Sequence, residues 1–123
     1  MSGIKSILAD TNILIYFLEG RPEVSYYQFS TFHISVITEI ELLGVKTIEG
    51  ISMKDRRNII KHCIILPFDD DVKETTIQIK QHTKIKTPDA IIAATAIKYQ
   101  LPFVTADKGF TRIDGLNLIL LEL

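Results

Sequence analysis

The chain of 123 residues has the size of one domain, and its 46% hydrophobic and 24% charged residues exclude a disordered polypeptide. Fourteen Lys and Arg against fifteen Asp and Glu give a net charge of −1, so a nucleic acid would have to be held by a local basic patch. No apolar run is long enough to cross a bilayer, and the first is too short for a signal peptide. We therefore expect a single domain over residues 1–123, located in the cytoplasm and with no membrane partner.

Short apolar runs alternate with helical patterns along the chain. The runs predict strands at residues 4–9, 33–37, 64–68, 101–106 and 118–121. The segments between them predict helices at residues 12–19, 38–45, 52–62, 71–83 and 87–99, with a turn or short helix near residues 22–29. This alternation predicts an α/β fold with a parallel sheet of about five strands flanked by helices, and most strands are apolar enough to be buried on both faces.

Three of the predicted helices begin with a recognisable signal. Ser52 and Asp71 are each followed by an acid three residues later, which is typical of a helix N-cap. Thr87 precedes Pro88, which we expect at the first helical position. Residues 69–71 form the densest acidic run of the chain, and we expect it to cap the following helix rather than to act in catalysis.

Four acids lie where a parallel sheet gathers its ligands. Asp10 and Asp107 end the first and fourth predicted strands, Asp89 lies in the first turn of its helix, and Glu41 lies within the helix at residues 38–45. Ligands of open α/β sheets collect outside the carboxyl ends of the strands. All four carboxylates could therefore reach one place.

Each of these acids also has an ordinary structural explanation. Asp10 could cap the next helix, Asp89 would be favoured by the helix dipole, and Asp107 suits a turn. Glu41 is harder to explain, because its apolar neighbours would bury its charge without a partner. A metal ion is one candidate for neutralising Glu41, and Lys46 is another.

The acids occur within four blocks that extend over most of the chain. The blocks are residues 7–12 (ILADTN), 35–44 (SVITEIELLG), 87–96 (TPDAIIAATA) and 104–110 (VTADKGF). In order and spacing they resemble the PIN-domain ribonucleases, especially the VapC-type toxins of type II toxin–antitoxin systems. This resemblance implies a PIN-like three-layer α/β/α fold and endonucleolytic cleavage of RNA. It also implies a cognate antitoxin protein and a homodimer as partners, and Mg²⁺ or Mn²⁺ bound by the matching acids, Asp10, Glu41, Asp89 and Asp107.

The block around Glu41 departs from the family pattern. Many relatives have one more residue between the helical Glu and the next Gly, whereas Gly44 lies only three residues after Glu41. Glu39 is therefore a rival, and two residues so close on a helix point about 200° apart. We choose Glu41, because its spacing from Thr38 matches the family better.

Other polar residues have expected supporting roles. Asn12 and Thr105, each two residues from a quartet acid, would hold the ligands or a bound water. Lys80, His82, Lys84 and Lys86 would steer RNA, with help from Arg21 or Lys108, although a solvated helix end explains them equally well. The lone Cys63 is expected to be a small buried side chain, and the three histidines, His33, His62 and His82, are expected to be structural or surface residues rather than metal ligands.

Two other functional classes remain open at this stage. A magnesium-dependent phosphotransfer enzyme also places Asp at strand ends, but the run from Asp10 to Asn12 lacks the second acid of a haloacid-dehalogenase-like phosphatase. A PIN-like fold that only binds RNA or a protein is the non-enzyme alternative, for which loss of a quartet acid would be the sequence signal. No quartet acid is missing here.

Overall fold

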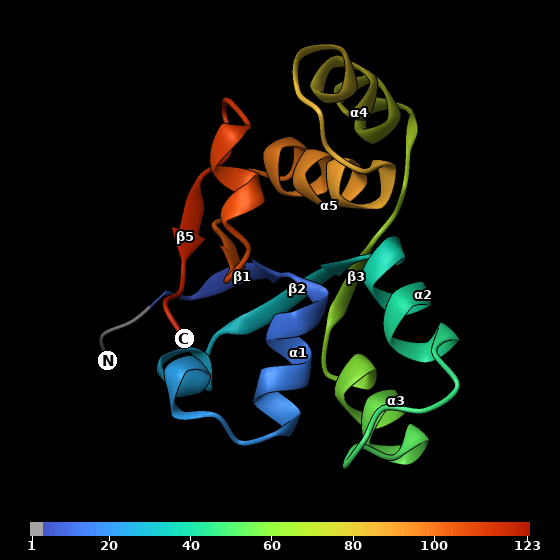
Figure 1. Cartoon of the computed structure of the whole chain (residues 1–123), viewed down its shortest axis with the longest axis vertical. Coiled ribbons are helices and arrows are strands. Elements are labelled where there is room, and N and C mark those ends of the chain that lie inside the picture. Colours follow the sequence, from blue (N-terminus) through green and yellow to red (C-terminus); the bar gives the residue numbers. More distant parts are fainter. Residues whose placement is uncertain (1–3) are drawn as a thin grey trace.

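The computed structural model describes residues 4–123, and its centre is a five-stranded parallel sheet in the order β3-β2-β1-β4-β5 (Figure 1). The strands are β1 (Ser6–Ala9), β2 (Thr31–Ser35), β3 (Ile64–Leu66), β4 (Phe103–Thr105) and β5 (Leu118–Leu120). The helices are α1 (Thr11–Leu18), α2 (Val36–Gly44), α3 (Met53–Lys61), α4 (Asp70–His82) and α5 (Thr87–Lys98), with short 3₁₀ helices η1 (Pro22–Tyr27) and η2 (Lys108–Arg112).

Helices cover both faces of the sheet because the strand side chains alternate between two cores. On β1, Ile7 and Ala9 belong to one core with residues of α1, η1, α2 and α3, whereas Leu8 belongs to the other with residues of α4, α5 and η2. Figure 1 shows α1 and α3 on one side of the sheet and α4 and α5 on the other. The predicted α/β/α fold with a five-stranded parallel sheet is confirmed.

Two strand predictions were wrong in detail. The second strand is Thr31–Ser35 rather than residues 33–37, because the Ser35 side chain accepts a 3.0 Å hydrogen bond from Ile37 N and starts α2. The third strand is not buried on both faces, since Ile64 is 48% exposed and Ile65 is 38% exposed. Its place at an edge of the sheet explains this exposure.

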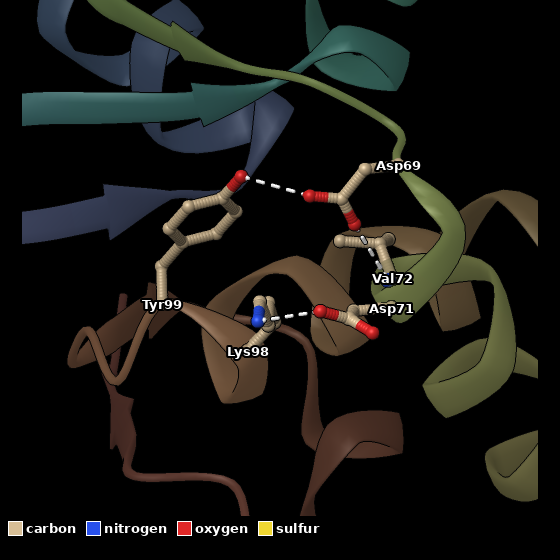
Figure 2. Close-up of polar contacts among 5 residues, drawn as sticks. All are labelled: Asp69, Asp71, Val72, Lys98 and Tyr99. Carbon is tan, nitrogen blue, oxygen red and sulfur yellow. Dashed lines mark hydrogen bonds and ion pairs between the residues drawn. The ribbon is translucent and has the colours of Figure 1, made fainter.

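The acidic run at residues 69–71 caps α4 as expected, but through Asp69 and not Asp71. The Asp69 carboxylate accepts a 2.9 Å hydrogen bond from Val72 N and a 3.2 Å hydrogen bond from the Tyr99 hydroxyl (Figure 2). Asp71 instead pairs with Lys98 at 2.8 Å and so ties α4 to the end of α5. The run therefore has the structural role that the sequence predicts.

The starts of α3 and α5 test the other two cap signals. Ser52 accepts a hydrogen bond from Asp55 N at 3.1 Å and is the N-cap of α3, as predicted. The helix α5 starts at Thr87, as its predicted range has it, but the N-cap is Lys86, so Pro88 is not the first helical residue as we expected. Pro88 thus occupies the second helical position. The first four N–H groups of a helix have no acceptor within it, so a proline there costs no hydrogen bond.

Of the histidines, His33 is half-buried, whereas His62 and His82 are exposed. Each histidine ring contacts a backbone carbonyl, that of Ile7 for His33, Asn58 for His62 and Gln78 for His82. Cys63 is half-buried, and burial raises the pKa of its thiol to about 11, which keeps it protonated and unreactive. Within residues 4–123 no helix has the length and apolar character to cross a membrane.

Candidate active site

A cavity of about 310 Å³ lies beside the carboxyl ends of β1 and β4, and we call it the acid cavity. Four chain segments bring one acid each to it: the end of β1, the middle of α2, the first turn of α5 and the end of β4. Aliphatic side chains of α1, α2 and the loop after α2 complete its wall. Its lining residues are Asp10, Thr11, Asn12, Ile15, Glu41, Leu42, Val45, Ile48, Asp89 and Asp107.

Asp10 is the most deeply placed of the four acids, with 7% of its surface exposed. It is the N-cap of α1, and one carboxylate oxygen accepts a 2.8 Å hydrogen bond from Thr11 N. The other oxygen accepts a 2.7 Å hydrogen bond from the Thr105 hydroxyl. Burial raises the pKa of Asp10 to about 6, the charges of Asp89 and Glu41 add to the rise, and the two hydrogen bonds oppose it.

Glu41 is held toward the cavity by a hydroxyl next to Asp10. The Thr11 hydroxyl donates to the Glu41 carboxylate at 2.6 Å, and the Thr11 oxygen lies 3.1 Å from that of the buried Thr38. Glu39 does not line the acid cavity, whereas Glu41 does. Sequence reasoning missed Thr11 and Thr38, although hydroxyl residues directly after one acid and three residues before another were a readable signal.

Asp89 and Asp107 face the same cavity from the other side. Burial raises the pKa of Asp89, repulsion from Glu41 and Asp107 raises it further, and the positive charge of Lys86 opposes both. The Asp107 N–H donates to the Thr105 hydroxyl at 3.0 Å, and its carboxylate accepts from Gly109 N at 2.8 Å. Asp107 therefore also makes the turn contact that its sequence setting suggests.

The residues expected to support the acids fall into two groups. Thr105 contacts Asp107, the acid two residues away, and it also contacts Asp10, which its spacing did not predict. Asn12 lines the cavity and is exposed, but over residues 4–123 its side chain makes no hydrogen bond to another residue. Thr11 has the role that we expected of Asn12, because its N–H donates to Asp10 and its hydroxyl donates to Glu41.

The predicted RNA-steering lysines lie at the approach to α5. Lys84 and Lys86 are exposed, and Lys86 is close enough to act on the charge of Asp89. The Lys80 ammonium is less available, because it donates to the Ile85 carbonyl at 2.8 Å. Of these lysines, Lys86 is therefore the one placed to act beside Asp89.

The donors around the cavity suit a hard divalent cation. They are mainly the oxygens of four carboxylates, with the Thr11 hydroxyl and the Asn12 amide, and oxygen is the ligand type that Mg²⁺ and Mn²⁺ prefer. In the described part of the chain, no three His, Cys, Asp or Glu side chains are drawn together closely enough to hold an ion as they stand. Like charges repel, and Asp10, Glu41 and Asp107 each accept a hydrogen bond from a neighbouring group, so the acids would have to converge by side-chain rotation on a cation.

A family model described as PIN domain matches residues 7–116. The chain belongs to the PIN domain family. PIN domains are typically nucleases, and the resemblance found in the four sequence blocks is confirmed.

Several solved structures are similar to this PIN domain over almost its whole length. A toxin–antitoxin complex from Klebsiella pneumoniae has 32% identity and a TM-score of 0.77, with 92% of this chain and 95% of that chain covered. FitAcB from Neisseria gonorrhoeae has 28% identity and a TM-score of 0.69, with 91% and 95% covered. DNA-bound VapBC from Salmonella typhimurium shares the fold, with 23% identity, a TM-score of 0.75 and coverage of 94% and 98%. A comparison with curated proteins gives no match.

Proposed function

We propose that this PIN domain is a metal-dependent endoribonuclease and the toxin of a toxin–antitoxin pair. The observation that carries the proposal is the acid cavity, which is lined by one acid from each of four separate segments, and in which burial and then mutual repulsion raise the pKa values of Asp10 and Asp89. A cluster of carboxylates that repel one another is unfavourable unless a cation joins it. Asp10, Glu41, Asp89 and Asp107 would hold that cation.

The chain's own residues would prepare the acids for this task. Thr11 N and the Thr105 hydroxyl donate to Asp10, and hydrogen bonds to a carboxylate favour its ionised form. The Thr11 hydroxyl orients Glu41 in the same way. Such contacts to ligand side chains fix their direction and strengthen metal binding.

The reaction would need no histidine base. None of the three histidines lines the acid cavity. When bound, a divalent cation supplies activation of water and stabilisation of charge on the phosphate and the leaving oxygen. Lys86 would attract the neighbouring phosphates of RNA, and the expected products carry 5′-phosphate and 3′-hydroxyl ends.

The proposed partners rest on the relatives. The Klebsiella pneumoniae protein was solved in a toxin–antitoxin complex, and its identity to this chain is high enough to share the family. We accordingly propose a small antitoxin protein as the partner that restrains the nuclease. A homodimer is proposed on the same resemblance.

The test compares wild type with Asp89→Asn on folded and unstructured RNAs, with Mn²⁺ or with EDTA. Both proteins are purified through unfolding and refolding to remove a bound antitoxin, and the ends of the products are mapped. Asp70→Asn is the matched control, because Asp70 is an exposed acid at the start of α4 that pairs with Lys73 on the same helix. Asp70 also lies far from Asp89. Its neighbour Asp71 contacts Lys98, and Lys98 is nine residues from Asp89 along α5, a length of roughly 14 Å.

The proposal predicts cleavage by wild type and Asp70→Asn in Mn²⁺, and none by Asp89→Asn or in EDTA. Equal cleavage by the folded Asp89→Asn variant would contradict it. If wild type cuts none of the RNAs in either condition, the alternative of a PIN-like module that only binds RNA or protein is favoured.

A further inference from the structure

A second cavity of about 600 Å³ adjoins the acid cavity, and we call it the side cavity. The two share Asp10, Asn12 and Asp107 as lining residues. Beyond these, the side cavity is lined by Tyr16 of α1, Lys108 of η2 and residues 120–123, which leave the end of β5. Its volume is within the roughly 300–1,000 Å³ of pockets that hold small molecules. Whatever occupies it would lie directly beside the acids.

The charges of the side cavity argue against a phosphate as its occupant. Three carboxylates line it, those of Asp10, Asp107 and Glu122, against the single ammonium of Lys108. A phosphate would be repelled from most of this wall unless cations intervene. An uncharged, flat group meets no such repulsion, and it could contact the aliphatic part formed by Leu121 and Leu123.

Tyr16 supplies a surface on which a flat group could stack. The Arg21 guanidinium covers one face of the Tyr16 ring, 4.9 Å from its centre, and this cation–π contact holds the ring in place on α1, so a flat group would stack on the opposite face. The neighbouring Asn12 side chain is exposed and offers both an amide donor and a carbonyl acceptor. An aromatic ring with an adjacent amide is the combination by which proteins recognise unpaired bases in RNA.

We propose that the side cavity binds one unpaired nucleobase of the RNA, next to the phosphate that lies at the acids. The base stacks on Tyr16 and forms hydrogen bonds with Asn12, while Lys108 contacts a flanking phosphate. This inference rests on the proposed function and deepens it, because it requires a single-stranded substrate. A base within a duplex could not enter the side cavity without leaving its stack.

The first experiment uses a fluorescent reporter at the proposed stacking position. The chain contains no Trp, so Tyr16→Trp creates a protein with one tryptophan. A base stacked on that ring quenches its emission. Phe68→Trp is the control, since Phe68 is 47% exposed and follows β3, at the opposite edge of the sheet from β5. Titration with a seven-nucleotide single-stranded RNA should quench Tyr16→Trp and leave Phe68→Trp unchanged.

The second experiment measures how much one base adds to binding. Seven-nucleotide RNAs, each lacking the base at one position, are compared with the complete RNA by fluorescence anisotropy in Mg²⁺. The protein carries Asp89→Asn to prevent cleavage, and Asp89 does not line the side cavity. Loss of the base at one position should weaken binding about tenfold, since all the RNAs keep the same phosphates.

Variants of Tyr16 connect this effect to the side cavity. Adding Tyr16→Leu should make the complete RNA and the one lacking the critical base bind equally, whereas Tyr16→Phe should keep the difference because the ring remains. If circular dichroism shows that Tyr16→Leu does not fold, the proposal is tested by the quenching of Tyr16→Trp relative to Phe68→Trp. Equal binding of all RNAs to the Asp89→Asn protein, or equal quenching of both reporters, would overturn the proposal.

The two proposals can fail separately. If wild type cleaves RNA but no single base affects binding, the proposed nuclease function stands and the proposed base site in the side cavity is wrong. Base-dependent quenching of Tyr16→Trp without cleavage by wild type would support the side cavity and contradict the nuclease.

Discussion

The hydroxyl of Thr105 donates a 2.7 Å hydrogen bond to the carboxylate of Asp10, a contact between residues 95 positions apart in the chain. It joins the ends of β1 and β4, which are neighbours in the sheet. The same hydroxyl accepts from the N–H of Asp107. The Thr105 side chain thus links two of the four acids. Valine has no hydroxyl, so replacing Thr105 by Val removes both hydrogen bonds.

Replacing Thr105 by Val should weaken Mn²⁺ binding by about 10- to 100-fold, the usual effect of removing a residue that orients a metal ligand. Calorimetric titration of the folded protein measures the change. Thr105→Ser keeps the hydroxyl and should bind nearly as wild type does. Unchanged affinity in the valine variant would show that Asp10 needs no orientation by Thr105.

The stability of the metal-free protein should fall as pH rises from about 4 to 6. The pKa of Asp10 is about 6 in the folded state against 3.8 for an ordinary Asp, so over this interval the folded protein binds more protons than the unfolded chain. Ionising buried Asp10 therefore costs on the order of 3 kcal/mol above pH 6. The raised pKa of Asp89 acts in the same direction. Denaturant unfolding in EDTA at a series of pH values measures this trend.

The variant Asp10→Asn isolates the contribution of Asp10 to that trend. Asn is as good an N-cap as Asp, and its carbonyl can still accept from Thr11 N. The variant should be more stable than wild type at pH 7 without metal, and its stability should depend less on pH. A variant with the full pH dependence of wild type would place the titrating group elsewhere.

Glu41→Gln and Glu39→Gln should separate the two candidate helical acids. In wild type, Mn²⁺ at a hundredfold excess over its Kd adds about 2.7 kcal/mol and raises the Tm by several degrees. Glu41 lines the acid cavity, so Glu41→Gln should lose most of this rise, whereas Glu39→Gln should keep it. Thermal unfolding with and without Mn²⁺ provides the comparison, and the reverse result would make Glu39 the ligand.

Arg56 should be a major contributor to stability. It is 2% exposed, and its guanidinium donates to the carbonyls of Leu42, Val45 and Lys46 at 3.0, 2.6 and 3.3 Å. Arg56→Met leaves these acceptors without a donor and should lower the free energy of unfolding by about 3 kcal/mol or more. Arg57→Met, at the exposed neighbouring position, should change it by less than about 0.5 kcal/mol.

Lys86 and Lys80 should differ in RNA binding despite their similar sequence setting. Lys86→Ala should reduce the slope of log affinity against log salt by about 0.7, the effect of one phosphate contact on a single strand. Lys80→Ala should change it less, because the Ile85 carbonyl already occupies its ammonium. Binding measured between 50 and 200 mM salt, with the Asp89→Asn protein, distinguishes the two. A slope for Lys86→Ala equal to that of the parent protein would mean that Lys86 makes no phosphate contact.

The sequence by itself determined the fold class and the segments that carry the acids. Alternation of apolar runs with helical patterns is a local property, since each strand or helix follows from residues a few positions apart. The carboxyl ends of parallel strands share one edge, so Asp10 and Asp107 could be placed together before any coordinates existed. The four blocks supplied the family for the same reason, because their order and spacing are written along the chain.

Only the tertiary structure decided which side chains meet. The contacts of Thr11 with Thr38 and Glu41 cross about thirty residues, and they depend on how α1 packs against α2. The burial of Arg56, an ordinary surface residue by type, follows from the position of α3 under the end of α2. The side cavity likewise exists because β5 delivers residues 120–123 next to α1. Periodicity reports the face on which a residue lies, but contacts between distant segments depend on packing, which no local pattern encodes.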